Sequence, residues 1–346
     1  MRRPILAASL AAALLLTSCG GEAASSPAEP VGPVTDLESL VEQAEDEGKL
    51  LMYTSLTESD LERLTTGFTE KYDIEVQALR LGGTDAATRF DTEVDDSAPS
   101  ADLLVLADPI YIGDATSRGS LTPLEDTGLF ELLDTVPEHL RAPEISSAIV
   151  QIVNSGIAYN TDNVSPEEVP SSWEDLLDPR WNQKLIGTTP ESSMNNLVTW
   201  GQLYDSFGED FVASIGNQVS RTYPNLVPLH ESLAAGDGDI ALQSAQFFVE
   251  AQKAQGKPVE FVNLQPSVYP VHALGISARA NSPYAARLLA YHLMTKEGAA
   301  TITQPEIGSF SAYDEDLIPE DFAVISTEKS SKYQGMKNEI SAAFGG

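Results

Sequence analysis

Between residues 49 and 108, short runs of apolar residues alternate with segments in which apolar residues recur every three or four positions. The runs predict strands and the spaced segments predict helices. Two short apolar runs predict buried strands and read KLLMYTS (49–55) and ADLLVLAD (101–108). Residues 74–81 predict a third strand. The apolar residues that recur at helical spacing after the first run are Leu61, Leu64, Phe68 and Tyr72. Strands alternating with helices predict an α/β fold with a mainly parallel sheet.

The loops that follow these strands are the first candidates for a binding site, because ligands of such sheets lie beyond the carboxyl ends of the strands. Ser59 and Glu62 have capping-box spacing and predict that the first helix starts at Ser59. The candidate residues at the strand ends and just after them are Thr54, Ser55, Glu58, Gly83, Thr84 and Asp108.

The first 34 residues have a different pattern. Arg2 and Arg3 precede an apolar run at 5–16, which is too short for a membrane span of about 20 residues and is typical of a secretory leader. The stretch that ends at Cys19, LTSC, is similar to a bacterial lipobox. We expect a signal peptide at 1–18, a lipid on Cys19 and a flexible tether at 19–34. Cys19 is the only cysteine, so no intramolecular disulfide is possible.

Charge narrows the choice of partners. The 346 residues carry 20 lysines and arginines against 52 acids, a net charge of −32. This balance argues against nucleic-acid binding and against a polybasic membrane surface. Catalytic signals are weak: His230-Glu231 opens like a zinc-protease motif, but Ala234 stands where the second histidine belongs. We therefore expect no enzyme, no cofactor and no metal, and keep an exported hydrolytic enzyme as the alternative.

An ordered set of segments carries a family resemblance. The segments are LLMYTSLTESDLERLTTGFTEKYDIEV, ADLLVLAD, IAYNTD, PSSWEDLLDPRWNQKLIG, LAAGDGDIAL and SPYAARLLAYHLMTKEGAATI. Together with the leader they resemble the solute-binding lipoproteins of bacterial ABC importers, in the ferric-iron-type branch of the type II periplasmic binding proteins.

The resemblance implies two hinge-linked α/β lobes with a ligand cleft between them. It assigns residues 35–150 and 272–305 to the N-lobe, and residues 151–271 and 306–346 to the C-lobe. It also implies an exported, lipid-anchored monomer that delivers a small solute to a permease and its ATPase.

The same resemblance raises the question of iron, since ferric binders of this branch use an adjacent pair of tyrosines. Phe247 and Phe248 stand near that place here, and phenylalanine offers no oxygen to a metal. Phe247 and the preceding Gln246 are candidates for an aromatic and polar ligand wall, with core packing as the alternative. Bare ferric iron or a ferric chelate stays an alternative cargo.

A small organic solute agrees better with the remaining residues. Ser192 and Ser193 precede a predicted helix, whose free N–H groups favour anions, so an oxyanion between Thr84 and this serine pair is one hypothesis. Helix capping alone would also explain these residues. Glu58 and Asp108 favour an amine instead, so a phosphorylated or zwitterionic solute would satisfy both sets. A lipid-anchored adhesion or scaffold protein is a further alternative.

Overall fold

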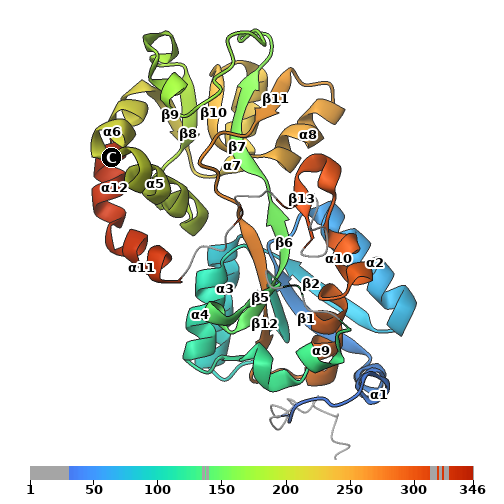
Figure 1. Cartoon of the computed structure of the whole chain (residues 1–346). Coiled ribbons are helices and arrows are strands. Elements are labelled where there is room, and N and C mark those ends of the chain that lie inside the picture. The colour runs from blue at the N-terminus through green and yellow to red at the C-terminus, as the bar shows by residue number, and fades with distance from the viewer. Residues whose placement is uncertain are drawn as a thin grey trace, which may run out of the picture.

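The computed structural model describes residues 31–134, 137, 140–311, 318, 322 and 327–345. Two sheets, each covered by helices on both faces, form two lobes joined end to end (Figure 1). This confirms the predicted α/β, two-lobed architecture. Cys19 and the expected leader and tether up to residue 30 lie outside the described residues.

The first lobe, here called the N-lobe, holds a sheet with the order β13-β6-β12-β3-β1-β2. Its strands are β1 (Lys49–Thr54), β2 (Glu75–Arg80), β3 (Leu103–Leu106), β4 (Leu121–Thr122), β5 (Arg141–Ala142), β6 (Ser147–Val153), β12 (Val271–Ser277) and β13 (Ser309–Phe310). Its helices are α1 (Leu37–Glu47), α2 (Glu58–Tyr72), α3 (Gly83–Asp95), α4 (Pro109–Ser117), α9 (Pro283–Leu293) and α10 (Lys296–Ile302).

The second lobe, the C-lobe, holds a sheet with the order β11-β7-β10-β8-β9. Its strands are β7 (Ser155–Asn160), β8 (Leu185–Thr188), β9 (Val219–Tyr223), β10 (Ile240–Ala245) and β11 (Val259–Val262). Its helices are α5 (Met194–Phe207), α6 (Glu209–Gln218), α7 (Leu226–Ala235), α8 (Gln246–Ala254), α11 (Thr327–Gly335) and α12 (Lys337–Phe344).

The N-lobe strands are buried on both faces, which explains their continuous apolar runs. In β3, Leu103 and Val105 pack into one apolar cluster, while Leu104 and Leu106 pack into the cluster on the opposite face. Strands β1, β2 and β3 are parallel, as the alternation predicted. Strands β6, β12 and β13 join antiparallel, so the sheet is mixed.

Two helix starts differ from their sequence signals. Helix α2 is capped by Thr57, whose hydroxyl accepts from the Asp60 N–H at 3.1 Å, and not by Ser59. Helix α9 begins at Pro283 without a side-chain bond from its N-cap residue. Its free amides donate instead to the carboxylate of Glu47, a contact across 237 residues of sequence that local spacing cannot reveal.

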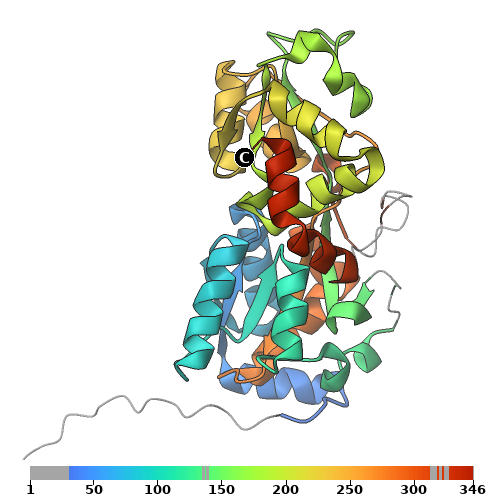
Figure 2. The same ribbon diagram turned by 90° about the vertical axis from the view of Figure 1, so that its left-hand side faces the viewer.

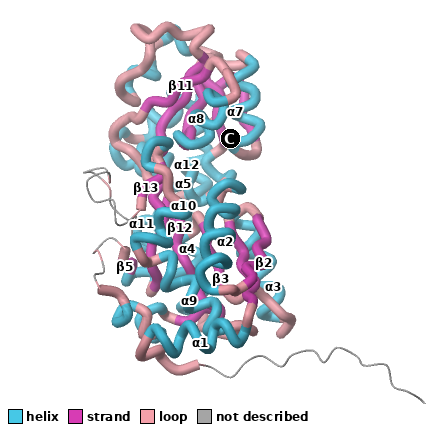
Figure 3. Tube along the Cα trace, turned by 90° about the vertical axis from the view of Figure 1, so that its right-hand side faces the viewer, coloured by secondary structure: helices cyan, strands magenta, loops and turns pink. Residues whose placement is uncertain are grey.

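Within the described residues the chain crosses between the lobes twice, and the tube view shows the waist of the molecule where these passages lie (Figure 3). The first crossing is at Asn154, between β6 and β7, slightly later than the boundary expected at residue 150. The second leads into β12 at Val271. Strand β13 still belongs to the N-lobe sheet, so assigning all of 306–346 to the C-lobe was wrong.

The last two helices pack on the C-lobe, and the turned view shows α11 reaching down toward the lobe junction (Figure 2). Gly201 on α5 allows the ring of Tyr333 on α11 to approach, because a Cβ there would lie 2.4 Å from the ring. No helix among the described residues is long and apolar enough to cross a membrane.

Candidate functional site

A cleft at the junction of the lobes has two connected compartments. The larger, about 1040 Å³, is here called the charged compartment because Glu58, Asp60, Glu62, Arg80, Glu250 and Lys253 contribute to its lining. The smaller, about 260 Å³, is called the neutral compartment. Its lining includes Ser192, Ser193, Asn195, Asn196, Asn225 and Gln243, with no Asp, Glu, Lys or Arg. Ser55, Phe247 and His272 line both compartments.

The C-lobe wall of the neutral compartment is a network of uncharged hydrogen bonds at the start of α5. Ser193 caps the helix and accepts from the Asn196 N–H at 3.2 Å. The Asn196 Nδ2 donates to Thr188 Oγ1 at 2.7 Å and to Ser192 Oγ at 2.6 Å. Thr188 in turn donates to Gln243 Oε1 at 2.9 Å. Since Thr188 and Gln243 are buried, these bonds hold the wall in one arrangement.

Gln243 adopts a backbone conformation that is uncommon for its residue type. Its φ is +59°, in the left-handed region, at an irregularity of β10 between Ala241 and Ser244. Backbone strain of this kind concentrates at functional sites. From this irregular backbone the Gln243 side chain accepts from the Thr188 hydroxyl and donates, at 3.4 Å, to the carbonyl oxygen of Asn196.

Three helices begin at this wall. Ser193 caps α5, Asn225 caps α7, and Ala245 precedes α8, and all three residues line the neutral compartment. The first amides of a helix have no intrahelical acceptor, and the helix dipole makes this end partly positive. The wall can therefore stabilise an anion without a cationic side chain.

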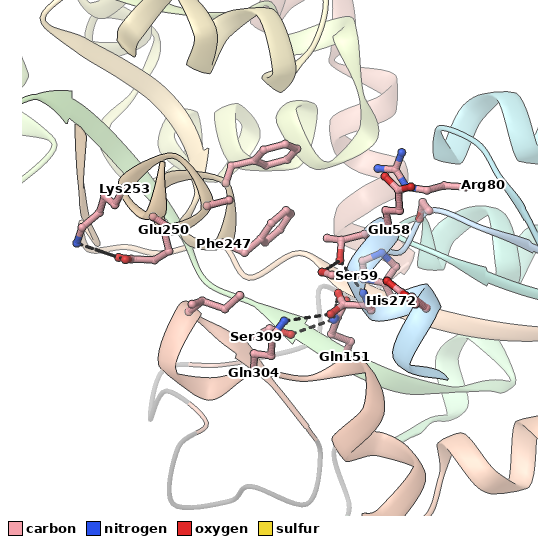
Figure 4. Close-up of a pocket in the computed structure, with 18 residues that line it drawn as sticks. Glu58, Ser59, Arg80, Gln151, Phe247, Glu250, Lys253, His272, Gln304 and Ser309 are labelled. Carbon is pink, nitrogen blue, oxygen red and sulfur yellow. Dashed lines mark hydrogen bonds and ion pairs between the residues drawn. The ribbon is translucent and has the colours of Figure 1, made fainter. Parts of the chain in front are cut away.

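The charged compartment is lined by both lobes and carries both signs of charge (Figure 4). Lys253 on α8 lies 2.8 Å from the Glu260 carboxylate and 3.3 Å from that of Glu250, so its charge is largely compensated. Arg80 donates through Nε to the Leu56 carbonyl at 2.8 Å and forms no ion pair with the described residues. Glu58 also forms no ion pair within the described chain. A solute group of either charge would find a partner here.

Phe247 and Phe248 line the charged compartment from the C-lobe side, with their ring centroids 4.7 Å apart. Phe248 also stacks on the buried His230 at 5.5 Å. Both phenylalanines are half-buried, so they form an aromatic wall of the cleft as well as packing. No group of three or more His, Cys, Asp or Glu residues that could hold a metal occurs among the described residues. Phenylalanine rings offer no oxygen or nitrogen, so this wall supplies no ligand to a ferric ion.

His272 lies on β12 where the two compartments meet, and it is only 7% exposed. Neither ring nitrogen makes a hydrogen bond of good geometry, although the Ser55 backbone lies nearby. Burial lowers the pKa of His272 to about 4, and the Ser55 backbone and the Asp60 charge offset this only in part. The imidazole is therefore neutral at neutral pH.

Five of the predicted site residues line the cleft. Ser55 and Phe247 line both compartments, Glu58 lines the charged one, and Ser192 and Ser193 line the neutral one. Ser55 Oγ accepts from the Ala107 N–H at 2.8 Å, so its own proton remains available to a solute. The helix-start argument found Ser55, Ser192 and Ser193 because helices do begin at the cleft, whereas Phe247 followed from the family resemblance and Glu58 from its charge.

The other five predicted residues do not line either compartment. Thr54 is fully buried and donates to the Val105 carbonyl at 3.0 Å. Asp108 caps α4 by accepting from the Tyr111 N–H at 3.0 Å, and its burial raises its pKa. Gly83 and Thr84 start α3 outside the cleft lining. Gln246 accepts from Asn154 at the first lobe crossing.

Asn196, Gln243 and His272 are among the cleft residues that sequence reasoning missed, and so are Arg80, Asn195 and Asn225. One signal was available, since Gln243 and His272 are polar residues inside the otherwise apolar strand segments IALQSA and VHALGIS. Asn196 carried no such signal, because a polar residue in the first turn of a helix is common.

Comparison with known proteins agrees with this architecture. A family model described as bacterial extracellular solute-binding protein matches residues 98–307. The chain belongs to this family. Its members are the solute-binding components of ABC importers, which work outside the cytoplasm, and their fold is not that of enzymes. The match confirms the family resemblance drawn from the sequence.

Individual relatives differ in what they bind. An uncharacterized protein from Haemophilus influenzae is 25% identical over 266 residues, covering 74% of this chain and 75% of that protein. Iron-bound HitA from Pseudomonas aeruginosa has a TM-score of 0.67 at 19% identity, covering 84% of this chain and 99% of HitA. AfuA from Actinobacillus pleuropneumoniae, with fructose-6-phosphate bound, has a TM-score of 0.59 at 22% identity, covering 73% and 81%. The structural similarity establishes the fold but does not identify the solute.

Proposed function

We propose that this protein captures a small organic solute that bears an oxyanion group, of the phosphorylated or zwitterionic class, for delivery to an ABC importer permease. The observation that carries the proposal is the neutral compartment. Its wall combines three helix starts with the hydroxyl and amide groups of Ser193, Asn195 and Asn225. Uncharged donors of this kind bind an oxyanion without fixing a counter-charge.

The charged compartment supports an organic solute over an inorganic anion. Its volume, about 1040 Å³, is far larger than a phosphate group needs. Glu58 and Arg80 would offer partners to an amine or a second oxyanion on the same molecule, and Phe247 would pack against its carbon skeleton. The solute would then lie with its oxyanion in the neutral compartment and its remainder in the charged one.

Ferric iron or a ferric chelate is the second candidate, because HitA is a structural neighbour of this chain. Phe247 and Phe248 count against it, since they place two apolar rings where the resemblance implies a phenolate pair. AfuA, the neighbour with fructose-6-phosphate bound, supports the phosphorylated class by analogy.

Export and anchoring belong to the same proposal. A lipid on Cys19 would hold the protein at the outer face of the cell membrane, with residues 19–34 as the tether, and permease and ATPase subunits as its partners. The two lobes would close around the solute as a monomer, pivoting about the crossings at Asn154 and Val271.

A binding screen tests the proposal. The purified protein is titrated with sn-glycerol 3-phosphate, fructose 6-phosphate, amino acids and ferric citrate while its thermal unfolding is followed. A solute at about 100 times its Kd adds about 2.7 kcal/mol of stability. We expect a shift with at least one phosphate ester or amino acid and no visible absorption band with ferric citrate.

Three results would contradict the proposal. A strong phenolate-to-iron band would favour the iron alternative. Release of inorganic phosphate from a sugar phosphate by the homogeneous protein would favour an enzyme. No shift with any phosphate ester, amino acid or ferric citrate would favour an adhesion or scaffold protein.

A further inference from the structure

The direction of the hydrogen bonds behind the neutral compartment fixes which atom of Asn196 faces the cleft. The chain of bonds starts at Gln243, whose Nε2 faces the carbonyl oxygen of Asn196 at 3.4 Å. An amide nitrogen opposite a carbonyl oxygen is a donor opposite an acceptor, so this orientation of the Gln243 amide is favourable and its reverse is not. The Gln243 Oε1 therefore faces Thr188.

The Thr188 hydroxyl has a single proton, and this proton is used by the 2.9 Å bond to Gln243 Oε1. Thr188 Oγ1 can consequently only accept from its other neighbour, the Asn196 side chain at 2.7 Å. The Asn196 nitrogen must therefore be the atom that faces Thr188. Its second proton goes to Ser192 Oγ at 2.6 Å, and the Ser192 proton goes to the Thr189 carbonyl at 2.7 Å.

This chain of bonds leaves one atom of the Asn196 amide without a partner. Both protons of Nδ2 are used, whereas Oδ1 accepts no hydrogen bond from the described residues. Asn196 is half-buried and lines the neutral compartment, so the unused oxygen belongs to the cleft surface. The compartment thus has a fixed acceptor among its donors.

We propose that Asn196 determines specificity by accepting a hydrogen bond from the solute, and that the solute carries a hydroxyl or amine beside its oxyanion. This inference rests on the proposed function and narrows its class. Inorganic phosphate or sulfate has an oxyanion but no carbon-bound hydroxyl or amine beside it. A phosphate ester of a polyol and an α-amino acid both have such a donor.

Gln243 and Thr188 act behind Asn196 as positioning residues. Thr188 bonds to the Asn196 side chain and Gln243 bonds to Thr188 and to the Asn196 carbonyl, and both residues are buried, so water cannot easily replace them. Rotating the Asn196 amide by half a turn would place its oxygen against an oxygen of Thr188 that has no proton to give. Two oxygens facing each other without a proton repel and leave both unsatisfied, which holds the amide in one orientation.

A matched pair of solutes tests the inference. sn-Glycerol 3-phosphate and n-propyl phosphate have the same phosphate and chain length, but only the first carries hydroxyls. We measure the Kd of both by isothermal titration calorimetry with the wild type, with Asn196→Ala and with the control Asn217→Ala. Asn217 is exposed on α6 and does not line either compartment.

We expect the wild type and Asn217→Ala to prefer sn-glycerol 3-phosphate at least tenfold, and Asn196→Ala to bind both solutes with affinities within threefold. Equal binding of the two solutes by the wild type overturns the inference and leaves the proposed function standing. A preference that persists in Asn196→Ala also overturns it. If the wild type binds neither these two nor any other screened phosphate ester or amino acid, the proposed function fails and the inference fails with it. If Asn196→Ala does not fold, Asn196→Ser, whose shorter side chain does not reach the place of Oδ1, is measured instead and is expected to lose the preference in the same way.

Discussion

Adding one negative charge at the start of α5 tests whether the bound solute is anionic or cationic. Ser193 caps this helix and lines the neutral compartment. Aspartate caps a helix as well as serine does, so Ser193→Asp keeps the bond to the Asn196 N–H that now measures 3.2 Å. An acid at this position also suits the helix dipole. The substitution therefore changes the charge of the compartment without weakening the fold.

The magnitude follows from the geometry of the helix start. An oxyanion that accepts from the free amides of Met194 or Asn195 would lie about 5 Å from the new carboxylate, roughly two hydrogen-bond lengths. At an effective dielectric constant of about 20 the repulsion is about 3 kcal/mol. Ser193 is exposed in the free cleft, so screening reduces this to about 1–2 kcal/mol. We expect Ser193→Asp to bind sn-glycerol 3-phosphate about 5- to 30-fold more weakly than the wild type.

The assay is calorimetric titration at low and high salt, with Ser193→Asn as the matched control. Asparagine caps equally well and adds no charge, so its Kd should stay near that of the wild type. The difference between the two variants should shrink at high salt, because salt screens exposed charges. Binding by Ser193→Asp that is as tight as that of Ser193→Asn, or tighter, would refute an oxyanion in this compartment.

Three further predictions concern stability and anchoring. Burial lowers the pKa of His230, His272 and His292 to about 4, below the unfolded value of about 6.5. Between these values the unfolded chain binds more protons than the folded one, so the free energy of unfolding should fall as pH drops from 6.5 toward 4. The urea midpoint should be lower at pH 5 than at pH 7, and His292→Gln should reduce this difference. A difference as large in His292→Gln as in the wild type would show that His292 does not contribute to it. Gly201→Ala should lower the free energy of unfolding by about 1–3 kcal/mol, because its Cβ meets the Tyr333 ring, and an unchanged urea midpoint would disprove this overpacking. Cys19→Ala should abolish incorporation of labelled lipid in cells, and continued labelling would refute the anchor.

The fold was predictable where the signal is local. Short apolar runs gave β1 and β3, strand propensity gave β2, and the residues Leu64, Phe68 and Tyr72 do form the buried face of α2. The antiparallel pairing of β12 with β3 and β6 was not predictable, because it depends on which strands meet across more than a hundred residues. The Glu47 carboxylate at the start of α9 was missed for the same reason.

The site was predictable only as far as helix starts reveal it. Ser55, Ser192 and Ser193 could be predicted because hydroxyl residues at helix starts are recognisable from the sequence. They line the cleft because helix starts form part of its walls. Asp108 also stands at a helix start that is recognisable from the sequence, but it caps α4 and does not line the cleft. What distinguishes these residues is the relative placement of the two lobes, which no local pattern encodes. Gln243 was missed because a left-handed glutamine within a strand has no sequence signature.

Gln246 illustrates how a residue predicted for the cleft can serve the hinge. Its N–H donates to the Asn154 carbonyl at 3.1 Å, and its Oε1 accepts from Asn154 Nδ2 at 2.9 Å. Asn154 also accepts from Asn263 and donates to the Gly308 carbonyl at 2.7 Å, so the first passage between the lobes is bonded to the start of the second and to the residue before β13. Gly308 has a φ of +76°, and a Cβ there would lie 2.4 Å from Gln246 Oε1. Gln246 is therefore part of the bonding around the first passage between the lobes, one residue from the Phe247 wall of the cleft.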